Sequence, residues 1–245
     1  MTYLQFHFVF ILPVIVLLWY MLPSKVAGTQ GKHWFYLFAV MGIAFVYTTP
    51  WDNYLVYRGI WGYGNERVLG VIGYVPIEEY LFFLLQPILT GLFFFLLYTR
   101  RTSERPTGCL YPYVRYTGVT FWLLVTCAGA YMLTFDKTTY MGLILAWAAP
   151  VLAGMWYIIG SAIWDIRRTF IWSLGIPTVY LWVADRIAIG LGIWEISSNY
   201  TIGWHILGLP IEEAMFFMIT NLLCLGGLAV FMRFWEGDHP KPESK

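Results

Sequence analysis

The sequence predicts an all-α integral membrane protein with seven transmembrane helices, arranged as two parallel three-helix repeats joined by a linker helix. Three observations lead to this fold class. Of the 245 residues, 59% are hydrophobic and only 12% are charged, whereas soluble domains carry roughly 25% charged residues. Apolar segments recur at the length that a bilayer requires, and two motifs of the first half return in the second half.

Seven apolar segments are long enough to cross a hydrocarbon core, which takes about 20 helical residues. The first segment has no basic residues at its start and no small-residue cleavage site at its end. We therefore expect it to remain as a helix rather than to be removed as a signal peptide. The expected spans are residues 3–22, 33–51, 76–98, 116–134, 139–160, 168–189 and 208–232.

An internal repeat relates the first three spans to the last three. Residues 52–61 return as 185–194, with Asp, Gly, Ile and Trp in the same frame, and residues 76–83 return as 210–217 with six of eight positions identical. Equivalent spans are four crossings apart, which is an even number, so the two units run in the same direction. Their motifs therefore open on the same membrane face and can border a shared cavity.

This repeat sets the expected organisation of the chain. Residues 1–98 form the first repeat, 99–135 a cytoplasmic loop with the linker helix, 136–235 the second repeat, and 236–245 a disordered polar tail. Lys and Arg are distributed unevenly between the two faces, with 4 on one face and 11 on the other. Because cytoplasmic loops carry the excess of basic residues, we expect the N-terminus outside and the C-terminus in the cytoplasm of a multi-pass cell-membrane protein.

Several classes of site are disfavoured by the residues that the chain lacks. Three scattered cysteines and four histidines show no spacing typical of a disulfide framework or a metal site. There is no Gly-x-Gly-x-x-Gly fingerprint for a dinucleotide, and the last span contains no lysine for a retinal Schiff base. We therefore expect no metal, no cofactor and no nucleic-acid partner.

Two Pro-Ile-Glu-Glu segments supply the candidate catalytic residues Glu78, Glu79, Glu212 and Glu213. Acidic residues are ordinary at the first turn of a helix, where they favour its positive end. Here, however, the pair occurs twice, precedes aromatic residues and opens a membrane span, where charge is costly and indicates function. Neighbours on a helix point about 100° apart, so one glutamate of each pair can face a cavity. Carboxyl groups brought together in apolar surroundings tend to keep a proton, as a general acid must.

Other polar and aromatic residues of the repeat are candidates for supporting roles. Asp52 and Asp185 either orient or deprotonate the glutamates, or are ordinary helix-end residues. Aromatic rings near the glutamates either stabilise a carbocation or serve as packing and interfacial residues. The candidate substrate-contacting residues are Phe82, Phe83, Phe216, Phe217, Trp61, Trp194, Tyr80 and Asn221.

On the duplicated Pro-x-Glu-Glu motif the chain resembles the membrane-type lycopene cyclases, which include paired bacterial subunits, fused archaeal and bacterial forms, and the cyclase half of fungal bifunctional enzymes. The resemblance implies a step of carotenoid biosynthesis that needs no cofactor. A carboxylic acid protonates the terminal double bond of lycopene, the next double bond attacks the cation, and proton loss closes a β-ring. Two such reactions give β-carotene by way of γ-carotene. One glutamate would be the proton donor, and another glutamate or an aspartate would take the departing proton.

The two units differ at two positions near the motif. Ala214 stands where the first unit has Tyr80, and Asn221 stands where it has Pro87. These differences indicate divided roles for the two halves, with acid chemistry in one of them.

The expected partners are a lipophilic carotenoid taken from the bilayer and membrane lipids. Contact with other carotenoid enzymes, the oligomeric state, the number of ends cyclised and the ring type remain open. Two alternatives are another carotenoid end-group enzyme, such as a hydratase or a cyclase of elongated carotenoids, and a proton-coupled small-molecule transporter. Parallel repeats also occur in transporters, but residues 81–95 and 215–223 are almost wholly apolar, which disfavours a polar transport path.

Overall fold

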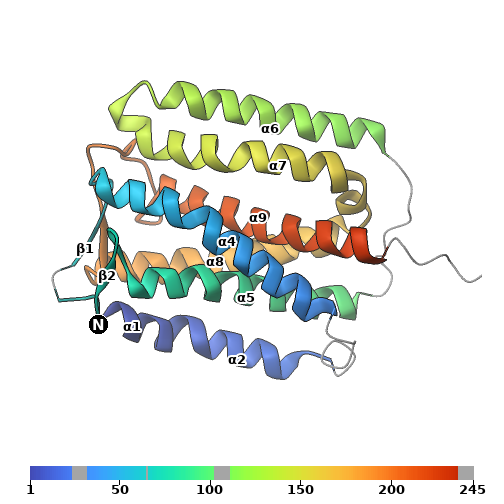
Figure 1. The fold of residues 1–245 in the computed structure, drawn as a ribbon, viewed down its shortest axis with the longest axis horizontal. Helices are drawn as coiled ribbons and strands as arrows, with labels where there is room; N and C mark the ends of the chain where they lie inside the picture. The colour runs from blue at the N-terminus through green and yellow to red at the C-terminus, as the bar shows by residue number, and fades with distance from the viewer. Residues whose placement is uncertain (24–31, 65, 102–110, 237–245) are drawn as a thin grey trace, which may run out of the picture.

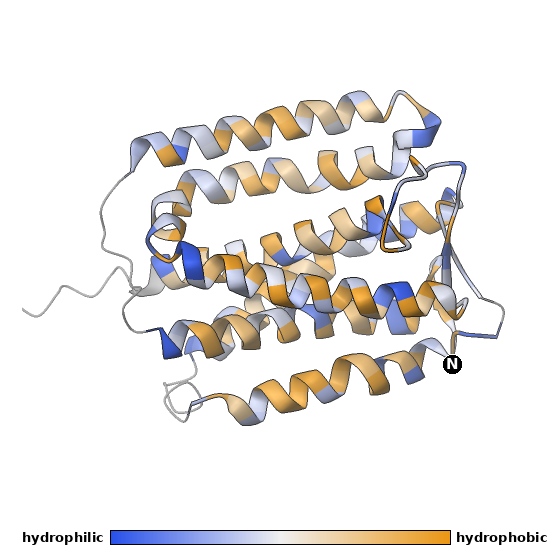
Figure 2. Ribbon diagram, turned by 180° about the vertical axis from the view of Figure 1, so that it is seen from behind, coloured by the Kyte–Doolittle hydropathy of each residue, from blue (hydrophilic) through white to orange (hydrophobic). Residues whose placement is uncertain are grey.

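The protein is a bundle of long helices that run side by side, with short strands gathered at one end (Figure 1). This computed structural model describes residues 1–23, 32–64, 66–101 and 111–236. The N-terminus lies at the end of the bundle that carries the strands (Figure 1). Apolar residues predominate along the helices, as expected for a protein whose solvent is lipid (Figure 2).

The first helix consists of α1 (Tyr3–Phe6), the π-helical turn η1 (His7–Ile11) and α2 (Leu12–Met21). The other helices are α4 (Lys32–Tyr57), α5 (Ile77–Arg100), α6 (Pro112–Met132), the 3₁₀ turn η2 (Asp136–Thr138), α7 (Thr139–Asp165), α8 (Arg167–Gly190) and α9 (Ile211–Glu236). The strands are β1 (Trp61–Tyr63), β2 (Val71–Ile72), β3 (Val75–Pro76), β4 (Trp194–Ile196), β5 (His205–Ile206) and β6 (Leu209–Pro210).

Five helical segments of the described residues are long and apolar enough to cross a membrane: Tyr3–Met21, Lys32–Tyr57, Ile77–Arg100, Asp136–Asp165 and Ile211–Arg233. They correspond to five of the seven expected spans. The remaining two, α6 and α8, have 21 and 24 residues but are not apolar enough to be identified as spans by composition. An all-α membrane protein is thus confirmed, while the seven-span layout and the domain boundaries remain predictions. The expected tail lies outside the described residues from position 237 onward.

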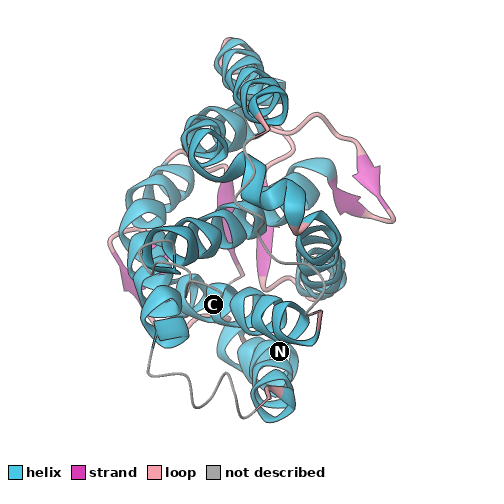
Figure 3. Ribbon diagram, turned by 90° about the vertical axis from the view of Figure 1, so that its right-hand side faces the viewer, coloured by secondary structure: helices cyan, strands magenta, loops and turns pink. Residues whose placement is uncertain are grey.

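The helices that carry the Glu-Glu pairs, α5 and α9, lie at the centre of the bundle. In each of them 67% of the membrane-spanning window is buried, compared with 22% in the first helix. They pack against each other and against α4 and α8, while α6 packs on the outer side of α7. A view along the helices shows this arrangement (Figure 3). The glutamates are therefore held in the part of the molecule with the most protein around it.

A buried polar cluster joins α5 to α8 and α9. The Gln86 amide donates to the Thr220 hydroxyl at 2.8 Å and to the Asn221 side-chain oxygen at 3.1 Å. Thr90 donates to the same Asn221 oxygen at 2.7 Å, and the Asn221 amide donates to Thr178 at 2.9 Å. Such bonds between helices are favoured in a membrane because no water competes for these groups. Asn221, expected as a substrate contact, is therefore placed as a link between helices.

Equivalent segments of the two repeats pair with each other across the molecule. β1 and β4 run antiparallel, and Gly62 lies opposite Glu195, its own counterpart 133 residues later. Gly59 and Gly192, which precede these strands, have φ of +65° and +64°, a backbone conformation that glycine adopts without strain. The recurrence of Gly, Ile and Trp thus corresponds to a glycine turn followed by a strand in both halves.

Helix α4 extends six residues beyond the end expected at position 51, although it contains Pro50. Proline removes a backbone donor and disturbs the preceding turn. Two side chains bond to the carbonyl groups around it, because Thr49 donates to Phe45 O at 2.6 Å and Asn53 donates to Thr49 O at 2.9 Å. Asp52 therefore lies inside α4 rather than at its end. Its counterpart Asp185 likewise lies five residues before the end of α8.

Candidate active site

The first turns of α5 and α9 border one cavity at the strand end of the bundle. The cavity measures about 30 Å³, which is the space of about one water molecule. Aromatic and acidic side chains from both repeats surround it, and none of its described lining residues is basic. The lining residues are Tyr3, Phe6, Trp61, Tyr63, Glu79, Phe82, Leu181, Ala184, Asp185, Trp194, Glu213, Phe216 and Phe217.

The second glutamate of each pair faces this cavity and accepts a tyrosine hydroxyl. The Tyr3 hydroxyl donates to Glu79 Oε2 at 2.5 Å, and the Tyr140 hydroxyl donates to Glu213 Oε1 at 2.6 Å. Both tyrosines belong to the first helix of their repeat, and all four residues are at most 5% exposed. Each carboxyl group is thereby fixed in orientation and removed from water.

The first glutamate of each pair turns away from the cavity and binds a loop. Glu78 Oε1 accepts the backbone N–H of Leu69 at 2.8 Å, and Glu212 Oε1 accepts that of Ile202 at 2.7 Å. These two backbone donors have the same role in the two repeats, although they lie 133 residues apart and the glutamates 134. The rotation of about 100° between adjacent helical residues separates the two roles. Glu78 and Glu212 therefore shape the site by holding the loops before β2 and β5.

A further hydroxyl reaches Glu79 from the strand region. Tyr63 of β1 donates to Glu79 Oε2 at 3.4 Å. Loss of hydration raises the pKa of Tyr63 well above its ordinary value, and the nearby Glu79 carboxylate adds to this increase. Tyr63 therefore keeps its proton and remains a donor. Glu79 is thus contacted by two hydroxyl groups, and Glu213 by one.

The two aspartates are both buried but have different partners. Asp185 lines the cavity, lies close enough to Glu213 and Glu79 for electrostatic interaction, and accepts the Trp194 indole N–H at 2.7 Å. Asp52 is 0% exposed and interacts electrostatically with Glu79. Neither of its carboxyl oxygens has a hydrogen-bond partner among the described residues. The two halves are therefore similar in backbone but unequal in the surroundings of their aspartates.

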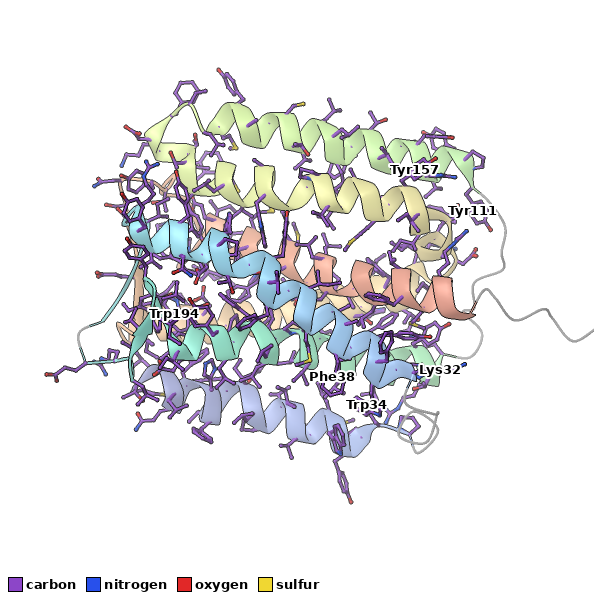
Figure 4. The ribbon with its side chains drawn as sticks, in the orientation of Figure 1. Lys32, Trp34, Phe38, Tyr111, Tyr157 and Trp194 are labelled. Carbon is purple, nitrogen blue, oxygen red and sulfur yellow. The ribbon has the colours of Figure 1, made fainter. Side chains whose placement is uncertain are left out.

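Each repeat supplies a tryptophan to the other repeat's side of the cavity. The Trp194 ring lies 4.8 Å from Tyr3 and 5.1 Å from Phe6, measured between ring centroids. The Trp61 ring lies 5.9 Å from Tyr140 and 5.6 Å from Phe216. Figure 4 shows Trp194 at the strand end of the bundle. The antiparallel pairing of β1 with β4 produces this exchange, because it carries each strand into the opposite half.

Aromatic rings one helical turn beyond the glutamates also border the cavity. Phe82 and Phe217 meet edge to face at 6.1 Å, and Phe216 lies 5.4 Å from Phe217. The negative faces of such rings attract cations. A cavity with carboxyl groups at one end and ring faces around them can deliver a proton and stabilise the carbocation that results.

The chain can be compared with families of known proteins. The family described as lycopene cyclase matches residues 1–97 and 137–231. The chain belongs to the lycopene cyclase family. The matched segments leave out residues 98–136, which contain α6.

Curated members of the lycopene cyclase family resemble the chain over most of its length. A protein named lycopene beta-cyclase from Halobacterium salinarum is 44% identical over 194 residues, which cover 78% of this chain and 80% of that protein. The bifunctional lycopene cyclase/phytoene synthases of Podospora anserina and Phycomyces blakesleeanus are 36% and 34% identical. Those matches cover 82% and 90% of this chain but only 36% and 37% of the fungal proteins. No solved structure matches the chain.

Three of the expected contact residues lie away from the acid cavity of this lycopene cyclase family member. The Tyr80 hydroxyl accepts from Asn53 at 3.0 Å and donates to Ile72 O at 2.9 Å, near the β2–β3 hairpin. Phe83 lines a separate inner cavity, and Asn221 belongs to the polar cluster. The remaining expected aromatic residues, Phe82, Phe216, Phe217, Trp61 and Trp194, all line the acid cavity.

The sequence interpretation did not include the tyrosines that bind the glutamates. Tyr3 and Tyr140 each follow a threonine, so a Thr-Tyr pair opens the first helix of both repeats. The Thr-Tyr pair is therefore repeated, but at a different spacing from the other motifs. The two tyrosines are 137 residues apart, whereas Asp52 and Asp185 are 133 apart. A search in one fixed frame misses it.

His7 is a further residue that the interpretation did not include. It is 0% exposed and sits at the start of the π-helical turn, a feature frequent at functional sites. Its Nε2 lies 2.9 Å from Glu78 O, and its ring stacks at 6.1 Å on Phe82. The equivalent position of the second repeat is Ile144. His7 therefore packs against α5 of the first repeat, and the second repeat has no histidine at the equivalent position.

Proposed function

We propose that the protein is a lycopene β-cyclase that converts the ends of lycopene into β-rings, giving γ-carotene and then β-carotene. The observation that carries this proposal is the pair Glu79 and Glu213, each bound to a tyrosine hydroxyl, which face one aromatic cavity. Membership of the lycopene cyclase family and the name of the archaeal relative support the same activity.

The proposed reaction is an isomerisation in which proton loss balances proton gain. A protonated carboxyl group among Glu79, Glu213 and Asp185 gives its proton to the terminal double bond, which leaves a tertiary carbocation. The electrons of the next double bond in reach attack that cation and form the ring carbon–carbon bond. A second carboxylate then removes a proton from the ring, which restores a double bond. No electrons enter or leave, so the reaction requires no oxidant or reductant.

Glu79 and Glu213 are proposed as the groups that exchange protons with the substrate, while Glu78 and Glu212 position the loops. Carboxyl groups buried together favour a state in which at least one keeps its proton. Phe82, Phe216, Phe217 and the two tryptophans surround the site where the cation forms, so that water is excluded and does not quench it. Exclusion of water also distinguishes a cyclase from a hydratase.

We further propose that the seven long helices all span the membrane as three, one and three, with the strand end outside the cell. In this arrangement the acid cavity lies near the outer surface. The described basic residues Lys32, Arg100, Arg115, Arg167 and Arg233 are at the opposite ends of the helices. The excess of basic residues at those ends supports a cytoplasmic location for them.

The proposal is tested by producing the chain in a bacterium that accumulates lycopene and by separating the extracted pigments. We expect γ-carotene and β-carotene from the wild type. Glu79→Gln and Glu213→Gln should each lower product formation by about 10²- to 10⁴-fold, since general acid–base catalysis contributes about that much. Glu78→Gln and Glu212→Gln should retain activity within about tenfold, because an amide oxygen still accepts one backbone N–H.

A C-terminal tag measures the amount of each variant in the membrane. Unchanged lycopene with wild-type protein present would refute the cyclase proposal. Full activity of both Glu79→Gln and Glu213→Gln would instead refute the assignment of these residues while leaving the reaction in place.

A further inference from the structure

An open apolar groove runs along the exposed side of α4 and is bordered by Trp147 of α7. It has a volume of about 900 Å³, and its lining includes Phe38, Gly42, Val46, Tyr47, Trp51 and Trp147. Phe38 and Val46 are 63% and 72% exposed, and Figure 4 shows Phe38 on α4. The groove lies within two segments that are apolar enough to cross a membrane, so lipid is the medium from which it is filled.

A second, inner cavity lies between the groove and the acid cavity. This inner cavity of about 90 Å³ lies between α4, α5, α7 and α9. It shares Ile43, Tyr47 and Trp147 with the groove, and it shares Phe216 with the acid cavity. The three spaces therefore form a series of neighbouring cavities from the lipid to Glu79 and Glu213.

A series of stacked aromatic rings follows the same route. Tyr47 stacks on Trp147 at 5.0 Å and Trp147 on Trp51 at 4.6 Å, with interplanar angles of 16° and 20°. Trp51 in turn stacks on Phe216 at 5.7 Å with an angle of 3°. Flat, nearly parallel rings make favourable contact with another flat π-system. A conjugated polyene is such a system, whereas a saturated acyl chain is not.

The outermost pair of this series also closes the route. The Tyr47 hydroxyl donates to Trp147 O at 2.8 Å and so bridges α4 and α7. The acid cavity has space for about one water molecule, so side chains must move before a substrate end can reach the glutamates. Rotation of Tyr47 and Trp147 would join the groove to the inner cavity.

We propose that the substrate's polyene chain enters from the lipid between α4 and α7, passes the Tyr47–Trp147 pair, and is guided along Trp51 and Phe216 to the acid cavity. This inference rests on the proposed function, because it takes the substrate to be a long conjugated hydrocarbon. It adds the entry route and the residues that form it.

Gly42 offers a way to block the groove without disturbing the fold. A Cβ atom added at Gly42 meets no atom within 4 Å, and the same is true at Gly154 of α7, which does not line the groove. Both glycines are exposed and helical. Gly42→Trp and Gly154→Trp therefore form a matched pair in which only the first substitution fills the groove.

The first experiment measures initial rates for purified protein in phosphatidylcholine vesicles as the lycopene content is varied. We expect Gly42→Trp to lower kcat/KM by about tenfold or more and Gly154→Trp to leave it within about twofold of wild type. A graded loss through Gly42→Ala, Gly42→Leu and Gly42→Trp should follow the size of the side chain. Wild-type kcat/KM in Gly42→Trp, or an equal loss in both tryptophan variants, would overturn the entry route.

A second experiment measures binding without turnover. In a background without native cysteines, Gly42→Cys and Gly154→Cys are labelled with a lipid-soluble maleimide in vesicles with and without lycopene. We expect lycopene to slow labelling at position 42 and not at position 154. Protection at position 42 in a protein that makes no cyclic product would retain the polyene groove and refute the proposed reaction. Equal labelling with and without lycopene would refute the groove, whatever the activity.

Discussion

At the residue scale, Tyr3 and Tyr140 determine how the two cavity glutamates are presented. Each hydroxyl donates to one carboxyl oxygen, which leaves the other oxygen of that group to face a ligand or a neighbouring acid. A buried hydrogen bond to a charged group contributes about 1.5–3 kcal/mol. Removal of either hydroxyl should therefore affect proton transfer without removing the acid itself.

We expect Tyr3→Phe and Tyr140→Phe each to lower the rate of cyclisation by about 10- to 100-fold, the equivalent of about 1.4–2.8 kcal/mol. The phenyl ring preserves the packing against Trp194 or Trp61, so the protein should accumulate normally. Pigment analysis of lycopene-accumulating cells measures the effect. Tyr113→Phe is the control, because Tyr113 is 82% exposed on α6. Equal activity of all three variants would contradict a role for the buried hydroxyl groups.

The roles of single residues were only partly predictable from the sequence. Carboxylates at the start of a membrane span are costly, so the four glutamates stood out. The division of each pair into Glu79 or Glu213 at the cavity and Glu78 or Glu212 at a loop depends on the rotation of the helix relative to its neighbours. That rotation is determined by packing between helices and leaves no pattern in the sequence around the motif.

At the element scale, the polar cluster around Asn221 holds the central helices together. Asn221 accepts from Gln86 and Thr90 and donates to Thr178. Bonds of this kind average about 0.6 kcal/mol each in a membrane protein. The three bonds together therefore contribute about 2 kcal/mol to the contact of α5 and α8 with α9.

We expect Asn221→Leu to lower the free energy of unfolding by about 2 kcal/mol, because leucine has a similar size but removes the three hydrogen bonds that Asn221 makes. Unfolding of the detergent-solubilised protein, followed by circular dichroism, measures this change. Thr126→Val serves as the comparison, since the Thr126 hydroxyl donates to Trp122 O within its own helix. A loss no larger than that of Thr126→Val would show that the cluster does not stabilise the bundle.

The helices were far easier to predict than the strands. Long apolar segments located every long helix to within a few residues at most ends, and α4 differed most because side chains support the backbone around Pro50. The strands have only two or three residues each, which is too short for an alternating pattern. Their pairing across the molecule depends on the relation between the repeats rather than on local sequence.

At the scale of the whole molecule, the distribution of charge predicts how the bundle lies in the membrane. Ser198 is exposed at the strand end, and Arg168 is exposed at the other end. In a background without native cysteines, we expect Ser198→Cys in intact cells to react with a maleimide that does not cross membranes. Arg168→Cys should react only after the cells are permeabilised. The reverse pattern would place the acid cavity at the cytoplasmic face.

That the protein is a membrane protein was predictable from composition, because apolar segments of about 20 residues are typical of transmembrane helices. The position of the acid cavity between the halves also followed in outline from the repeat, since parallel units present equivalent motifs on one face. The narrow cavity and the groove between α4 and α7 were not predictable. They depend on how side chains from four helices fill the space between them, which composition and periodicity do not specify.

The pairing of β1 with β4 has a consequence for how such a protein can be assembled. Trp61 packs against the second half and Trp194 against the first. A half on its own would therefore expose the edge of its strand and lack one of the tryptophans that line the acid cavity. Halves made as separate chains would have to associate before either could work. Joining them in one polypeptide fixes their ratio. Under the proposed reaction it also lets the two tyrosine–glutamate pairs diverge, so that one releases a proton and the other recovers it.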